Sequence, residues 1–135
     1  MSYPIKNIEC IGKTYGARLR EVGITTTGQL LAKSYTPIGR KELAVKSGIS
    51  EHDLRKWADM ADLMRIRGIA TQYCELLAST GVESIEELRL CAAEQLHPAL
   101  VEVNAKRKLV RQMPSVGQVA VWIAQARAMT PKMEY

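Results

Sequence analysis

The sequence predicts an all-α protein in which one helical unit is used twice and packed as a single compact body. Leu, Ile, Val and Ala recur at three- and four-residue spacing, which is typical of amphipathic helices, while the alternation expected of strands is scarce. Residues 8–15 (IECIGKTY) resemble residues 66–73 (IRGIATQY), which lie 58 positions later. Because this offset also relates Leu19 to Leu77 and Gly23 to Gly81, we expect two units, at residues 1–63 and 64–135.

Start signals support the predicted helices. A hydroxyl side chain placed three residues before a polar partner is typical of a capped helix N-terminus. This spacing occurs at four positions, and a Thr-Pro pair at residues 36–37 adds a fifth start: Thr26, Ser50, Ser84, Ser115 and Thr36. Ser50 and Ser115 are 65 positions apart rather than 58. The second unit has therefore gained seven residues, near His97-Pro98 or within residues 104–108.

Composition limits the class of protein. The 135 residues are 47% apolar, which is too high for a disordered chain, and the absence of Phe leaves aliphatic residues to form the core. The net charge of +5 permits a polyanionic partner without requiring one. The three cysteines form no C-x-x-C pair, so we expect reduced thiols. With no signal-peptide pattern and no membrane-length apolar run, a cytoplasmic protein is expected.

The repeated segments have the layout of a helix-hairpin-helix, in which a small residue lets the chain turn sharply between two helices. Residues 10–12 form the first bend and residues 68–70 the second, and we expect tandem helix-hairpin-helix (SAM-like) repeats. The amide groups of the helix after each bend could meet a phosphate oxygen. The candidate nucleic-acid-binding residues are Gly12, Lys13, Thr14, Arg18, Arg65, Arg67, Gly68 and Thr71.

Each bend departs from the general Gly-apolar-Gly pattern at one position. Cys10 replaces the first glycine of the first bend, and Ala70 replaces the second glycine of the second bend. Either side chain narrows the approach of a phosphate. A purely structural role for both hairpins is therefore an equal alternative. Trp57 and Trp122 are expected to anchor the core, and the three cysteines are expected to be small buried residues.

The sequence also resembles a known family. The segments that carry this resemblance are residues 36–44 (TPIGRKELA), 48–50, 61–66 and 100–104, together with Trp57 and Trp122. They are similar to a bacterial family known only as a domain of unknown function, number 4332. The resemblance covers nearly the whole chain. It implies an all-helical fold of tandem helix-hairpin-helix type and a link to nucleic acid, without an established activity.

Two functions remain open. The first is sequence-nonspecific DNA or RNA binding through the hairpin amides and nearby Lys and Arg side chains. The alternative is a protein–protein adaptor whose hairpins are structural. No motif of a hydrolase, phosphate-binding loop, zinc protease or dinucleotide site occurs, so no enzyme activity and no cofactor are expected. Neither His52 nor His97 has a second ligand at metal-binding spacing, so no metal site is expected.

Overall fold

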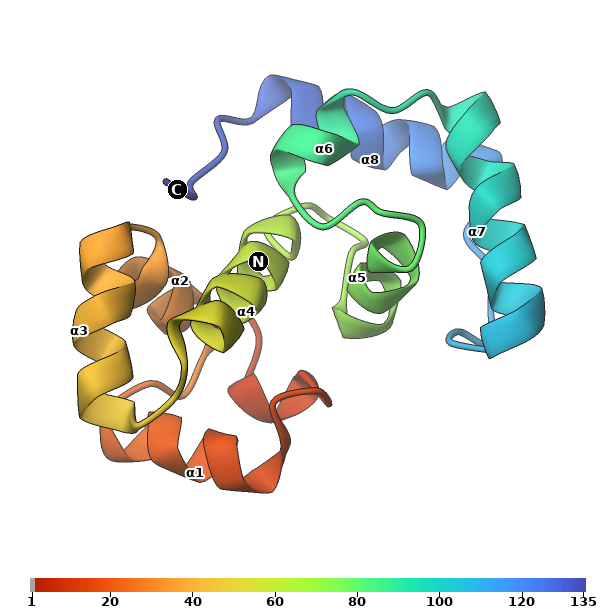
Figure 1. Ribbon diagram of the computed structural model, residues 1–135. Helices are drawn as coiled ribbons and strands as arrows, with labels where there is room; N and C mark the ends of the chain where they lie inside the picture. Colours follow the sequence, from red (N-terminus) through yellow and green to blue (C-terminus); the bar gives the residue numbers. More distant parts are fainter. Residues whose placement is uncertain (1) are drawn as a thin grey trace.

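The described chain is all-helical, as predicted. Figure 1 shows the computed structural model, which describes residues 2–135. Within these residues the only β-type pairing is an isolated bridge between Pro4 and Thr26. The elements in chain order are the 3-10 turn η1 (Ile5–Asn7), α1 (Gly12–Glu21), α2 (Thr27–Ser34), α3 (Pro37–Ser47), α4 (Glu51–Leu63), α5 (Thr71–Ala78), α6 (Ile85–Arg89), α7 (Ala93–Arg107) and α8 (Val116–Ala128).

The five predicted helix starts are confirmed. The hydroxyls that accept a hydrogen bond from the amide three residues later belong to Thr26, Thr36, Ser50, Ser84 and Ser115. In α2 and α8 the side-chain oxygens of Gln29 and Gln118 accept hydrogen bonds from the backbone N–H groups of Thr26 and Ser115, which completes a capping box. In contrast, α1, α5 and α7 begin without a side-chain cap. The two helices that follow the bends are thus among those whose first amides lack such a partner.

A single core connects the two halves of the chain. In Figure 1, α4 lies at the centre, with α1 to α3 on one side and α5 to α8 on the other. The buried apolar cluster includes Leu19 of α1, Leu54 of α4, Leu77 of α5 and Ile123 of α8. Burial of these side chains stabilises the fold by removing apolar surface from water. The shared core confirms the expectation of one compact body.

Both halves contain the same aromatic pair. The rings of Tyr15 and Trp57 lie 5.5 Å apart at an angle of 56°, and those of Tyr73 and Trp122 lie 5.2 Å apart at 51°. Tilted ring pairs at such separations are favourable. Trp57 and Trp122 are both buried, which confirms that they anchor the core. The expectation for the cysteines is wrong in part, because Cys74 is buried but Cys10 is exposed.

α7 and the loop after it are both longer than their counterparts in the first half. α7 contains 15 residues where α3 contains 11, and residues 108–115 separate α7 from α8 where residues 48–50 separate α3 from α4. The amide side chain of Asn104 closes this loop by hydrogen bonds to the backbone N–H (3.0 Å) and carbonyl (3.1 Å) of Val110. The longer loop thus begins at the end of residues 104–108, one of the two predicted locations.

After α8, residues 129–135 return to the first half of the protein. We call this segment the strap. Its Met133 is buried in a small second cluster with Leu31, Ala58 and Ala61. The strap therefore joins the end of the second half to α2 and α4.

Candidate functional site

The first bend is open to solvent. Gly12 begins α1 in the left-handed region (φ +72°), and no atom lies within 4 Å of a Cβ built on it. Ile11 provides no side-chain cap, and the first turn of α1 contains no acidic residue. The amide groups at a helix N-terminus carry partial positive charge and attract anions. An anionic oxygen can therefore reach this end of α1.

Two basic side chains lie along the same face of α1. Lys13 and Thr14 are exposed beside the bend, and Arg20 is exposed two turns later. The Arg20 guanidinium lies 3.7 Å from the Cβ position of Gly16, so it folds back toward the start of the helix. Arg18 is held differently, because its guanidinium donates to the Gly48 carbonyl (3.2 Å). Lys13 and Arg20 are thus the basic side chains best placed to contact an anion at the N-terminus of α1.

The second bend is closed by α8. The Arg67 amide donates to the Gln125 side-chain oxygen (3.0 Å), and the Gln125 side-chain nitrogen donates back to the Arg67 carbonyl (3.2 Å). A Cβ at Gly68 would lie 2.9 Å from Nε1 of Trp122. Gln125 therefore occupies both backbone groups of Arg67, and Trp122 lies where a side chain at Gly68 would project.

The other predicted residues of the second bend are also engaged. Arg65 forms a 2.6 Å ion pair with Asp62, which is almost completely buried. Thr71, at the start of α5, is itself buried. Of the second group of predicted residues, only the Arg67 side chain and the small surface of Gly68 are exposed. The structure thus leaves Gly12, Lys13 and Thr14 exposed together at one corner, whereas in the second group it buries Thr71 and pairs Arg65 with Asp62.

Each bend retains the one glycine that its backbone requires. Gly12 has φ +72° and Gly68 has φ +93°, a region that side chains with a Cβ rarely adopt. Ala70 has φ −106°, and Cys10 is not among the described residues with positive φ. The two substitutions relative to the general pattern therefore introduce no backbone strain.

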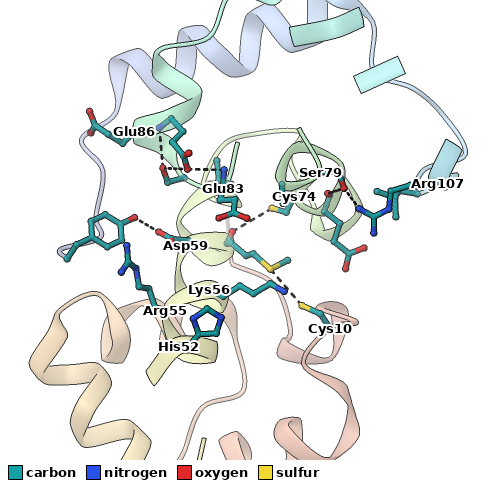
Figure 2. A pocket seen from close by; sticks show the side chains of 18 residues that line it. Cys10, His52, Arg55, Lys56, Asp59, Cys74, Ser79, Glu83, Glu86 and Arg107 are labelled. Carbon is teal, nitrogen blue, oxygen red and sulfur yellow. Dashed lines mark hydrogen bonds between the residues drawn. The ribbon is translucent and has the colours of Figure 1, made fainter. Parts of the chain in front are cut away.

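A cleft between the halves was not predicted from the sequence. It has a volume of about 1020 Å³, and Figure 2 shows the side chains that line it. Its acidic lining residues are Asp59, Glu75, Glu83, Glu86 and Glu87, and its basic ones are Arg55, Lys56 and Arg107, with His52 at the α4 end. Carboxylates outnumber Lys and Arg side chains, so this cleft does not suit a polyanion. No sequence spacing brings α4, α5 and α6 together, which is why pattern reasoning missed it.

Burial shifts the pKa values of several groups in the cleft. Burial raises the pKa of Asp59 to about 6, although the Tyr135 hydroxyl donates to this carboxylate and Arg55 lies nearby. Burial together with the hydrogen bond to Asp59 also raises the Tyr135 pKa. Burial raises the pKa of the Cys74 thiol to about 12, so this thiol stays protonated and unreactive at neutral pH.

The described residues contain no group of three or more His, Cys, Asp or Glu side chains that could hold a metal ion. His97 instead contacts the Pro114 carbonyl through Nε2 (3.0 Å). Within residues 2–135, none of the helices has the length and apolar character needed to cross a bilayer.

Comparison with known proteins identifies the family to which the chain belongs. No solved structure matches the chain significantly. A family described as "Domain of unknown function (DUF4332)" matches residues 9–129, which include both bends and all of α1 to α8. Since this match covers nearly all of the chain, the protein belongs to the DUF4332 family.

Proposed function

We propose that the protein consists of tandem helix-hairpin-helix units and binds nucleic acid without reading its sequence, through the first hairpin alone. In this proposal the second hairpin is structural. Such a role would be exercised in the cytoplasm, where the three free cysteines stay reduced. Contacts of this kind go to the phosphate backbone, which positions a protein on nucleic acid independently of base identity.

The open N-terminus of α1 carries this proposal. Gly12 leaves space for a phosphate, the first turn has no side-chain cap, and Lys13 stands at its edge. Arg20 folds back along the same helix and adds a second cation. The second bend supports the restriction to one hairpin, because Gln125 and Trp122 occupy its backbone surface.

The expected affinity is weak. A helix N-terminus stabilises a nearby anion by about 0.3–1 kcal/mol, whereas a micromolar complex requires about 8 kcal/mol. Most of the binding free energy must therefore come from counterions released by Lys and Arg side chains. Exposed Glu9, close to the bend, opposes this attraction. We expect a Kd of about 10⁻⁴ M at physiological salt, which is the weak end of nonspecific binding, and tighter binding at low salt.

Fluorescence anisotropy with labelled duplex DNA, single-stranded DNA and RNA tests the proposal. Binding should be detectable at low salt and should fall steeply as salt increases. Lys13→Glu and Arg20→Glu should each weaken binding and reduce the salt slope by about one phosphate contact. Lys33→Glu makes the same change of charge at an exposed position of α2 and serves as a control. Arg67→Glu, at the second bend, is a second control. Absence of binding at low salt, or equal losses in all four variants, would refute the proposal.

The alternative is a protein–protein adaptor, and two observations favour it. The cleft presents side chains of both charges, and α3 exposes Ile38 (72%) and Val45 (87%) two turns apart. Exposed apolar side chains on one helix face are typical of contact surfaces. If this alternative holds, Ile38→Ser with Val45→Ser should abolish partner binding in nuclease-treated extract, while Lys13→Glu should leave it intact.

A further inference from the structure

The strap is held in the way that peptide-binding grooves hold an extended peptide. Residues 130–135 form no regular secondary structure. The Glu134 amide donates to the Tyr35 carbonyl (2.7 Å), and the Arg40 guanidinium donates to the Glu134 carbonyl (2.8 Å). The amides of Lys132 and Met133 donate to one oxygen of Asp62, at 3.0 and 3.4 Å. These bonds recognise backbone and would form with any extended chain.

Side chains of the strap add selectivity. Met133 is buried against Leu31, Ala58 and Ala61. On either side of it, the Lys132 ammonium lies 4.5 Å from the centre of the Tyr35 ring, and the Arg55 guanidinium lies 4.4 Å from the centre of the Tyr135 ring. The Tyr135 hydroxyl also donates to Asp59. The groove therefore fits a cation, a flexible apolar side chain and an aromatic ring in that order.

The polar groups of the groove are held by residues outside the strap. Arg40 is only 5% exposed and also donates to the Ser34 carbonyl (2.8 Å). Asp62 is 2% exposed and is oriented by its ion pair with Arg65. Without an occupant, Arg40 and Asp62 would each lose hydrogen bonds in a buried setting, which is unfavourable. The groove is thus organised to hold a polypeptide backbone.

The second half carries a different side chain at the position equivalent to Asp62. Arg127 stands 65 positions after Asp62, the same offset that relates the caps of α4 and α8. Its guanidinium donates to the carbonyls of Arg89 (3.1 Å) and Cys91 (3.0 Å) within the second half. The position equivalent to Asp62 thus serves contacts between α8 and the chain after α6, rather than contacts with a strap.

We propose that this groove is a binding site for a protein partner that presents an extended segment of the pattern cation-Met-x-Tyr, and that the strap occupies it in competition. The contacts of Lys132, Met133 and Tyr135 show that the groove is complementary in charge and shape to such a segment. Displacement of the strap also removes Tyr135 from the wall of the cleft, beside Arg55 and Asp59 (Figure 2). This inference is independent of nucleic-acid binding at α1.

A fluorescent peptide of residues 129–135, blocked at both ends, is the probe. It is titrated by anisotropy with the whole protein and with the full-length variant Met133→Asp, in which the strap is disabled and the groove is intact. The variant should bind the peptide at least about tenfold more tightly than the wild type, because the strap no longer competes. The same peptide with Met133→Asp is the matched negative control and should bind neither protein.

Two further substitutions in the Met133→Asp variant locate the binding site. Arg55→Ala removes the contact with the Tyr135 ring and should weaken peptide binding several-fold. Lys56 is the next residue of α4 and is also exposed, but it forms no hydrogen bond or ring contact with the strap among the described residues. Lys56→Ala should therefore leave binding unchanged. Equal effects of the two substitutions would place the peptide elsewhere and overturn the proposal.

Other outcomes also decide against the proposal. If Met133→Asp keeps the helical circular dichroism of the wild type but binds no peptide up to about 1 mM, the groove has no recognition function. If Met133→Asp does not fold, Met133→Ser replaces it under the same criterion. If size-exclusion chromatography shows a wild-type dimer that either variant abolishes, the occupant is the strap of a second copy rather than a partner.

Discussion

Replacing Gly68 by Ala tests whether the second bend is closed by α8. The left-handed backbone of Gly68 (φ +93°) makes any Cβ unfavourable by about 1–2 kcal/mol. The new Cβ would also lie 2.9 Å from Trp122 Nε1. Trp122 is buried and its ring packs on Tyr73, so it cannot move away freely. Overpacking of this kind costs about 1–3 kcal/mol, which gives a total loss of about 2–5 kcal/mol.

Gly12→Ala is the matched control, because Gly12 also has positive φ but no atom lies within 4 Å of its Cβ position. Its expected loss is the backbone contribution alone, about 1–2 kcal/mol. Urea unfolding followed by circular dichroism measures both free energies of unfolding. Gly68→Ala should exceed Gly12→Ala by about 1–3 kcal/mol, the overpacking contribution. Equal losses would mean that Trp122 does not confine the second bend, and the case for a single open hairpin would fail.

Three other substitutions test separate features of the structure. The folded-state pKa of Asp59 is raised to about 6, so this group favours folding below about pH 4 and that contribution is lost as pH rises through 6. The shift corresponds to about 3 kcal/mol, reduced to about 1 kcal/mol because Asp59 is only half-buried. The free energy of unfolding of the wild type should fall between pH 4 and pH 7, and in Asp59→Asn this fall should be smaller by about 1 kcal/mol in urea titrations. An equal fall in both proteins would contradict the raised pKa of Asp59. Asn104→Ala should reduce the free energy of unfolding by about 1–3 kcal/mol, since the N–H and carbonyl of Val110 lose their partner; a change in urea midpoint within error would show that the loop closes without this side chain. Glu102→Gln should change thermal stability by less than about 0.5 kcal/mol, because its 3.6 Å pair with Lys106 is fully exposed to solvent, and a larger loss would indicate an additional contact.

Local features of the fold were predictable because their causes are local in sequence. A hydroxyl three residues before an amide it can cap specifies a helix start, so Thr26 and Ser115 could be identified without coordinates. The equivalent positions of Trp57 and Trp122 likewise predicted their burial. The exposure of Cys10 was not predictable from its residue type, because burial at a bend depends on which elements cover it.

The candidate site was predicted only in part. The start of α1 could be located from the bend at residues 10–12, and Gly12, Lys13 and Thr14 are exposed there, while their binding role stays a prediction. The difference between the two bends could not be anticipated, because Gln125 contacts Arg67 across 58 positions of sequence. The cleft and the groove that holds the strap could not be predicted for the same reason, since each combines side chains from segments far apart in sequence.

The order of amino acids alone determined the helical class, the duplicated unit and the helix starts, since each depends on interactions that span a few residues. Only the tertiary structure decided which corner faces water and which charges share a surface. The reason is physical: long-range packing places Trp122 over one glycine and leaves the other uncovered, and the strap crosses back to bury Met133. Two similar stretches of chain thereby acquire different surroundings.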